Sequence, residues 1–490
     1  MAIKTRKDYL ESMRSLRPNV YKFGELITDV TTHPATKRTI ESHCRAFDAS
    51  NDSELEELYT TTSTFTGEKI HRWNSMMQSS DDVIANMHIK RQNYRRTGSC
   101  TGGVCVGWNA QNVMWAITYD MDKEFGTNYQ ERLRNWILHA QEKGLTVAGA
   151  LTDPKGDRSL KPSQQPNPDA NLRIVEVKDD GIVIRGAKTM ICGVAASQEI
   201  FLLPGGVYGE DDKDYALACA IPKDIDGLTI IEATHPSDRR DLEPTAEDEV
   251  PDTGITQAYL LFEDVFVPNE RVFLCKEYAY TRNLITYFTS TYRACIGACV
   301  AGQGDVMIGA AILMARANGL SAKTFMKKLV DMSVNNQVTF GLGAGACAIG
   351  SKHHAGSWFA DPLTANTNKV MVASLPYEVK RLTQEIGGGV VETGCMPSYQ
   401  DFSNEDYGPL LQKYLKAGGP SAETRFKSAR LSEWLTVGAG IPGCMHGGGS
   451  PDGAKLVVRF TTPMEEYVEY AKKIMSIDEE IPEPEKPKKK

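Results

Sequence analysis

The chain has no run of 18 or more apolar residues, which is the length that a membrane-spanning helix needs. It also lacks the apolar core of a signal peptide, because its first residues, MAIKTRKDYLESM, already have the pattern of a helix. Positive charge is not in excess: 55 Lys and Arg face 63 Asp and Glu, for a formal charge of -8. A nucleic-acid partner would require a basic face. We therefore expect a cytoplasmic protein that binds neither membranes nor nucleic acid.

The remaining composition is that of an ordinary globular protein, with 41% hydrophobic and 24% charged residues over 490 positions. This length suits two or three layered domains. Helical periodicity covers 1–147, strand signals cover 148–276, and helical periodicity returns over 277–472. Strands are expected at 172–177 and 182–185 around an Asp-Gly turn, and at 215–221, 228–232 and 257–267. The pattern predicts an α+β fold with a β domain between two helical domains, followed by a disordered Pro- and Lys-rich tail over 473–490.

Eleven cysteines are present, and a reducing compartment makes disulfides an unlikely role for them. Scattered cysteines such as Cys44, Cys219, Cys275 and Cys347 suit simple apolar packing. Two local pairs differ from this pattern. Cys100 and Cys105 lie in a glycine-rich stretch, and Cys295 and Cys299 are one helical turn apart. These two pairs are candidate ligands for a metal or a cluster.

Four segments have the residue types that hold a large anionic cofactor. Segment 151–159 combines hydroxyls with two cations, and segment 185–193 follows a predicted strand and is rich in small residues. Segment 384–389 ends in three glycines, and segment 444–451 places His446 beside another glycine turn. Each also has a structural interpretation: a polar connector, a strand end, a helix C-cap or a structural histidine.

Taken together, several segments resemble the 4-hydroxybutyryl-CoA dehydratase and 4-hydroxyphenylacetate 3-hydroxylase family. The resemblance covers the chain up to the tail and includes 20–24, 125–129, 152–158, 181–188, 266–271, 304–311 and 445–447. It implies an acyl-CoA-dehydrogenase-like fold, bound FAD, and a homotetramer whose glycine-rich C-terminal helices help to bind a neighbour's flavin nucleotide.

The resemblance also implies where FAD lies. One side of the flavin would be held by the loop residues Thr152, Asp153, Lys155 and Arg158. The strand end that crosses its ring would contribute Lys188, Thr189, Cys192 and Gly193. The adenosine end would meet Gln384, Glu385, Gly387 and Gly388.

In the dehydratase arm of the family, a [4Fe-4S] cluster held by three cysteines and one histidine lies beside the flavin. The matching cysteines are Cys100, Cys105 and Cys299, with one more residue between the first two than the family leads us to expect. The histidine position falls on Tyr292, and a phenol is a poor cluster ligand. Cys295 lies one turn before Cys299, and we predict that it is the fourth ligand. The alternatives are an iron left open for substrate, or a flavin-only site lined by packing cysteines.

The proton-transfer groups that the resemblance implies are mostly replaced. Their positions hold Cys192, Gln257, Ile296, Val300 and Gly443. The remaining candidates for proton transfer are Tyr292, His446, Cys192 and Cys444, of which His446 has the best-matched ordinary pKa.

These replacements predict a substrate other than 4-hydroxybutyryl-CoA and a more apolar pocket. The first hypothesis is a radical-type lyase or isomerase of an organic acid or its CoA ester, with FAD and a [4Fe-4S] cluster. The second is an aromatic hydroxylase without a cluster, which takes reduced FAD from a separate reductase. The third is a catalytically silent subunit that pairs with an active paralogue.

Overall fold

The computed structural model describes residues 3–100, 102, 104–234, 252–437 and 447–482. The N-terminal part is helical, as predicted. The helix over residues 80–97 shows how the sequence sets its bounds: Ser79 accepts a hydrogen bond from the Asp82 N–H, and Gly98 ends the helix in a left-handed conformation. The helices are α1 (Arg6–Ser15), α2 (Pro34–Ser50), α3 (Glu56–Tyr59), α4 (Ser80–Thr97), α5 (Val104–Phe125) and α6 (Tyr129–Lys143).

Two sheets form the middle of the molecule. The larger has the order β2-β1-β10-β11-β7-β6, and the smaller has the order β12-β9-β8-β5. The strands of the larger sheet are β1 (Val20–Lys22), β2 (Glu25–Ile27), β6 (Arg173–Val177), β7 (Gly181–Cys192), β10 (Leu228–Glu232) and β11 (Gln257–Pro268). The strands of the smaller sheet are β5 (Val147–Ala150), β8 (Glu199–Leu202), β9 (Leu217–Pro222) and β12 (Val272–Cys275).

The predicted hairpin is present as β6 and β7, which pair antiparallel with Arg173 opposite Arg185. Strands β1 and β2 were not expected, since they lie in the segment predicted to be helical; β1 pairs in parallel with β10. The sequence analysis also missed β5 and β8. Every residue of these two strands is buried, so they lack the alternation of polar and apolar residues that identifies a half-exposed strand.

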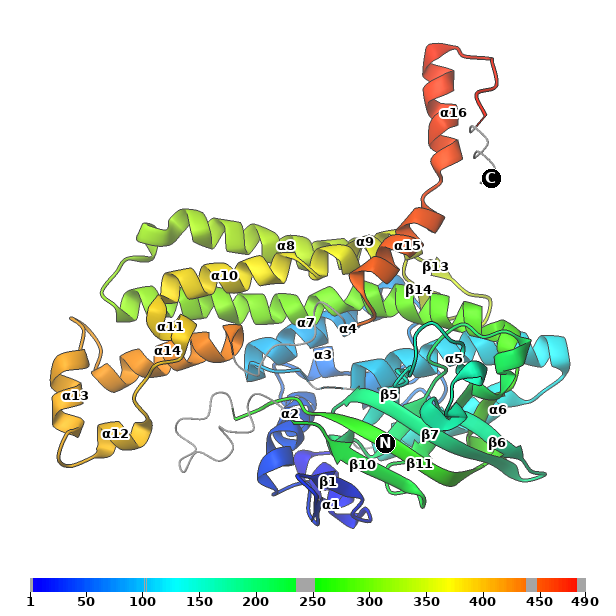
Figure 1. Cartoon of the computed structure of the whole chain (residues 1–490), viewed down its shortest axis with the longest axis horizontal. Helices are drawn as coiled ribbons and strands as arrows, with labels where there is room; N and C mark the ends of the chain where they lie inside the picture. The colour runs from blue at the N-terminus through cyan, green and yellow to red at the C-terminus, as the bar shows by residue number, and fades with distance from the viewer. Residues whose placement is uncertain (1–2, 101, 103, 235–251, 438–446, 483–490) are drawn as a thin grey trace.

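A bundle of long helices forms the C-terminal part (Figure 1). Its central helix, α7 (Thr281–Ala317), is apolar enough by length and composition to cross a membrane, but 67% of its most apolar window is buried inside the protein. This apolar composition matches its place in the middle of the bundle. The helices around it are α8 (Met326–Ala348), α9 (Pro362–Val372), α10 (Leu375–Gly387) and α14 (Ala422–Thr436).

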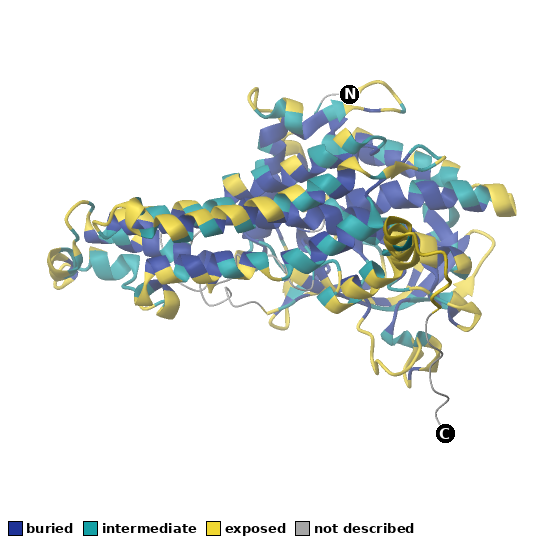
Figure 2. Cartoon of the chain, turned by 90° about the horizontal axis from the view of Figure 1, so that it is seen from above, coloured by how far each residue is buried: buried dark blue, intermediate teal, exposed yellow. Residues whose placement is uncertain are grey.

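Short helices complete both ends of the bundle. At the end remote from the β sheets lie α11 (Gly389–Thr393), α12 (Tyr399–Ser403) and α13 (Gly408–Leu415). Near the sheets, α15 (Pro451–Thr461) packs on α9, and α16 (Met464–Met475) projects away from the body. Helix α16 has no buried residue, and Figure 2 shows it as almost wholly exposed. One end of the bundle therefore carries three short helices, and the other end meets the β sheets.

Candidate functional site

Cysteine side chains from both helical parts converge beside the larger sheet. Cys100, Cys299 and Tyr292 belong to one apolar cluster, although Cys100 precedes α5 and the other two lie on α7. Three other cysteines, Cys105, Cys299 and Cys192, lie close enough to Cys100 to interact with it electrostatically. The interaction is strongest for Cys105. Four sulfurs are thus gathered, and the fourth comes from the end of β7 rather than from α7.

A backbone contact between two glycines brings the cysteine loop to the sheet. Gly102 and Gly193 both have positive φ, at 34° and 65°. A Cβ atom on Gly193 would lie 2.3 Å from the Gly102 carbonyl oxygen, so a larger residue at 193 cannot be accommodated. The Gly193 N–H also donates to the Thr256 carbonyl at 2.9 Å. This contact places the loop that carries Cys100 against the end of the strand that carries Cys192.

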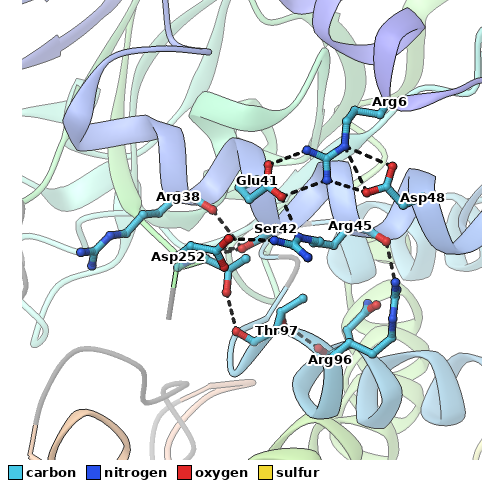
Figure 3. Close-up of polar contacts among 12 residues, drawn as sticks. Arg6, Arg38, Glu41, Ser42, Arg45, Asp48, Arg96, Thr97 and Asp252 are labelled. Atoms are coloured by element: carbon cyan, nitrogen blue, oxygen red, sulfur yellow. Dashed lines mark hydrogen bonds and ion pairs between the residues drawn. The ribbon is translucent and has the colours of Figure 1, made fainter. Parts of the chain in front are cut away.

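The other side of the loop is tied to α2 through residues 252–256. The Ser42 hydroxyl donates to the Gly254 carbonyl at 2.8 Å, and Thr253 donates to the Thr97 carbonyl at the end of α4. Figure 3 shows Ser42, Thr97 and Asp252 in this network. It also shows the ion pair between Arg45 and Asp252 at 2.7 Å. The cysteine loop is therefore held between α2, α4 and the sheet.

Burial decides the protonation of these thiols. Desolvation raises the pKa of Cys299 to about 12 and that of Cys192 to about 11. It also raises the pKa values of Cys100 and of the Tyr292 phenol well above their usual ranges. Near neutral pH these groups are protonated, and forming thiolates here requires a compensating cation such as a metal.

Lys90 provides a positive charge at this site and was missed by the sequence analysis. It is a buried residue of α4, and its ammonium lies 5.3 Å from the centre of the Tyr292 ring. Burial opposes its charge, whereas the nearby sulfurs, led by Cys105, raise its pKa once they are deprotonated. A lysine in a polar helix carries no sequence signal that distinguishes it from a surface residue.

A small internal cavity adjoins Lys90 and Cys105. Its volume is about 30 Å³, enough for about two water molecules. Besides apolar side chains, the cavity is lined by His43, Asn86 and Asn93. The Asn86 Oδ1 atom is buried and has no hydrogen-bond partner among the described residues, so a water in the cavity would satisfy it.

Cys295 lies close enough to Lys90 to interact with its charge, as the other sulfurs do, but its side-chain contact is with a different cysteine. Its side chain contacts that of Cys347 on α8, which lowers the pKa of Cys295, and the Cys347 sulfur lies 3.7 Å from that of Met87. Four residues of an α-helix turn through about 400°, so Cys295 and Cys299 point about 40° apart. Among the residues that the structure describes, no group of three or more His, Cys, Asp or Glu is arranged to hold a metal ion. The predicted ligand set of Cys100, Cys105, Cys295 and Cys299 is therefore not assembled.

The donor set nevertheless matches a cluster in its chemistry. Cys100, Cys105 and Cys299 supply soft sulfur ligands from two elements, and Tyr292 lies beside them. Coordination would require the sulfurs to draw closer together.

In the predicted flavin segments, two charged residues pair with each other. The Lys188 ammonium lies 2.8 Å from the Asp153 carboxylate, and both side chains are buried. Lys188 also donates to the carbonyls of Leu151 and Leu203. The pair therefore fastens loop 151–158 to β7, and the predicted contacts of Asp153 and Lys188 with FAD stay a prediction.

Breaking this pair should be costly. We expect Asp153→Asn to lower the free energy of unfolding by about 3–5 kcal/mol, because it leaves the Lys188 ammonium buried without its counter-charge. Chemical denaturation followed by circular dichroism measures this change. Asp264→Asn, which breaks the exposed pair with Arg185, is the control and should have little effect. Equal losses in both variants would contradict the structural role of the buried pair.

Loop 151–158 and the end of β7 lie next to each other and are called the ledge; its exposed residues include Lys155, Arg158 and Met190. The Thr189 N–H donates to the Thr152 carbonyl at 2.9 Å, so the two predicted segments lie side by side. Lys155 and Met190 have positive φ, at 72° and 56°, although neither is glycine, and Met190 is 57% exposed. Strained backbone and exposed apolar surface are typical of ligand-binding positions. The exposed cations of Lys155 and Arg158 add the charge that a pyrophosphate requires, so the ledge fits FAD.

The segment predicted to meet the adenosine end of FAD lies far from this ledge. Gln384, Glu385 and Gly387 are at the end of α10, where Glu385 pairs with Arg381 at 3.0 Å; Gly388 follows directly. Figure 1 shows this end of α10 beside α11, opposite the end of the bundle that meets the sheets. The neighbouring α7 is about 55 Å long at 1.5 Å per residue. One flavin cannot contact both groups within one chain.

The predicted residues His446 and Cys444 lie outside the described residues, as does Gly443. The turn that follows is described and reaches the site. A Cβ atom on Gly448 would lie 3.0 Å from the Tyr292 ring. Cys192 accepts a hydrogen bond from the Gln257 amide at 3.2 Å, so Tyr292 and Cys192 remain the described candidates for proton transfer.

Comparisons with known proteins agree with this arrangement. Residues 5–274 match the 4-hydroxyphenylacetate 3-hydroxylase N-terminal family, and residues 281–476 match its C-terminal counterpart. The chain is 36% identical to 4-hydroxybutyryl-CoA dehydratase/vinylacetyl-CoA-Delta-isomerase of Clostridium aminobutyricum, over 97% of this chain and 100% of that protein. It is 24% identical to the 4-hydroxyphenylacetate 3-monooxygenase oxygenase component of Thermus thermophilus, over 89% and 88%.

Solved structures give the same result. An oxygen-tolerant 4-hydroxybutyryl-CoA dehydratase from N. maritimus superposes with a TM-score of 0.94 at 33% identity, covering 99% of this chain and 97% of that one. The oxygenase component of 4-hydroxyphenylacetate 3-monooxygenase, complexed with FAD, has a TM-score of 0.83 at 21% identity, with 96% and 98% covered. Glutaryl-coenzyme A dehydrogenase shares the fold at 0.51 and 13% identity, covering 79% and 81%, so the predicted acyl-CoA-dehydrogenase-like fold is confirmed. This chain belongs to the family of 4-hydroxybutyryl-CoA dehydratase and 4-hydroxyphenylacetate 3-hydroxylase.

Proposed function

We propose that this protein is an FAD-dependent lyase with an iron–sulfur cluster. In this proposal it eliminates a leaving group from, or isomerises, a small organic acid or its CoA ester other than 4-hydroxybutyryl-CoA. The observation that supports it best is the gathering of Cys100, Cys105 and Cys299 beside Cys192, at the end of the strand that borders the flavin ledge. Apolar packing alone would not require three cysteines from two helical domains to lie together at the end of β7, the strand that is proposed to border FAD.

The cofactors would supply electron transfer and Lewis acidity at this place. The chain's own residues would bind and orient the substrate. Lys90 offers an ammonium to a carbonyl or carboxylate oxygen, and the Tyr292 phenol can donate a proton. Ile296 and Val300, both buried on α7, keep that wall of the site apolar and exclude water. His446 and Cys192 complete the proposed proton-transfer groups.

We further propose that the flavin site is completed by a second copy of the chain, in a cytoplasmic homotetramer. The support is the separation of the ledge at Thr152 and Thr189 from the end of α10 at Gln384. Two copies arranged head to tail would bring one chain's ledge to the other chain's α10.

Iron analysis of anaerobically purified protein tests the lyase. We expect about four irons and four sulfides per subunit, since the donor set suits a [4Fe-4S] cluster, together with one FAD. The absorbance spectrum should show cluster absorption beneath the flavin bands. Less than one iron per subunit in carefully protected protein would remove the lyase proposal and leave the flavin site intact.

The second candidate is a two-component aromatic hydroxylase without a cluster. It is favoured by the apolar wall at Ile296 and Val300. Product formed from a phenol only in the presence of oxygen and reduced FAD from a reductase would establish it. Turnover without oxygen would exclude it.

A further inference from the structure

Arg293 is a buried cation whose described hydrogen-bond partners are neutral. It follows Tyr292 on α7, and its Nε atom donates to the Gly448 carbonyl at 2.8 Å. An Nη atom donates to the Asn366 side-chain oxygen on α9. No carboxylate of the described residues lies within ion-pair distance of Arg293, and burial alone lowers its pKa. Burying a guanidinium without a counter-charge is costly, which points to a specific task for its hydrogen bonds.

The task is visible in the turn that Arg293 contacts. Gly448 and Gly449 have positive φ, at 72° and 94°. A Cβ atom on Gly448 would lie 3.0 Å from the Tyr292 ring, and one on Gly449 would lie 2.9 Å from an Arg293 Nη atom. Directly after the turn, Ser450 caps α15 by accepting the Gly453 N–H at 3.0 Å. The turn is therefore pressed onto two consecutive residues of α7.

Asn366 fixes the direction of the guanidinium. Its amide nitrogen donates to the Pro362 carbonyl at 2.7 Å within α9, which orients its side-chain oxygen toward Arg293. Tyr292 also stacks on Phe288, which lies four residues earlier on α7, with ring centroids 5.5 Å apart. The phenol ring is thus held between Phe288 and Gly448, and Arg293 holds Gly448 in place.

We propose that Arg293 is a positioning residue that holds the 447–449 turn against Tyr292 and thereby fixes the phenol beside the cysteine sulfurs. Arg293 itself touches no reacting atom in this scheme. The inference rests on the proposed function only in treating Tyr292 as part of the reactive site. Its geometric part, the clamp on the turn, stands independently of the cofactors.

Hydrogen–deuterium exchange of the holoenzyme tests the clamp, with Arg293→Gln, Arg293→Lys and Gly448→Ala as variants. Loss of a hydrogen bond from a charged donor is expected to speed amide exchange in the peptide that spans 447–461 by about tenfold or more in Arg293→Gln. Arg293→Lys keeps one donor and should restore part of the protection. Arg316→Gln, an exposed arginine on the same helix, is the control and should match the wild type.

The visible circular dichroism of the bound cofactors tests the positioning of Tyr292, since a merely structural clamp would not alter it. Arg293→Gln and Gly448→Ala should change this spectrum in the same way. Amide exchange in Arg293→Gln that stays within about twofold of the wild type would overturn the inference. Faster amide exchange with an unchanged visible circular dichroism spectrum would overturn it as well. If no variant and no wild-type preparation holds a cluster, the proposed lyase fails, whereas the exchange experiment still decides the clamp.

Discussion

Replacing Cys299 with serine is expected to remove the iron from the protein while FAD stays bound. Cys299 lies on α7 in the apolar cluster with Cys100 and Tyr292, so its sulfur is placed to serve as a ligand. Serine is nearly the same size, which avoids a packing defect, but its hydroxyl is a poor ligand for iron in a sulfur cluster. We expect iron to fall by at least about tenfold, because losing even an outer-shell partner of a metal ligand typically costs about 10–100-fold in affinity.

Cys295→Ser is the matched control for this experiment. Both cysteines are buried on α7, one turn apart, but Cys295 contacts Cys347 rather than the other sulfurs. We expect Cys295→Ser to keep its iron. Iron and sulfide analysis of both variants, purified without oxygen, gives the answer. Iron loss in both variants would support the four-cysteine set predicted from the sequence, whereas iron retained in Cys299→Ser would contradict both assignments.

Replacing Lys90 with methionine is expected to shift the midpoint potential of the cluster by on the order of 100 mV toward more negative values. The estimate takes one charge at roughly 6 Å in a medium with an effective dielectric constant of about 20. The sign follows because the reduced cluster carries more negative charge, which the Lys90 ammonium stabilises. Methionine keeps the length and apolar stem of the side chain, so packing against the Tyr292 ring is largely preserved.

Spectroelectrochemical titration of the purified holoenzyme measures this potential. Lys90→Arg keeps the charge and should remain close to the wild type. Lys143→Met, in the exposed last turn of α6, controls for a general change in protein charge. An unchanged potential in Lys90→Met would show that the ammonium does not act on the cluster. Such a result would leave Lys90 with a role only in substrate binding.

The sequence predicted the order of helices, strands and helices, as well as the β6–β7 hairpin. Those elements carry local signals: helical periodicity, strand alternation and an Asp-Gly turn. Strands β5 and β8 escaped because they are buried on both faces. Strand β1 escaped because it is three residues long and finds its partner, β10, some 200 positions later. Tertiary pairing of this kind has no local pattern.

The candidate site, too, was only partly predictable from the sequence. The resemblance to the family indicated Cys100, Cys105 and Cys299, and the structure brings their surroundings together. Helix spacing suggested Cys295, but spacing alone could not reveal that Cys347 on another helix lies opposite it. The resemblance also implied Asp153 and Lys188 as cofactor contacts, and the structure shows that these two residues form an ion pair with each other. Which charged residues face one another is decided by packing, which a single sequence does not display.

The touching glycines at 102 and 193 have a mechanical consequence. With no side chain between them, the loop that carries Cys100 and the strand that carries Cys192 meet backbone to backbone, and neither can shift without pushing the other. A substitution that displaces the backbone on either side of this contact should therefore displace the other side as well. Under the proposed function, an alanine at position 193, which follows Cys192 and adjoins none of the proposed cluster ligands in the sequence, would be expected to loosen both prosthetic groups together.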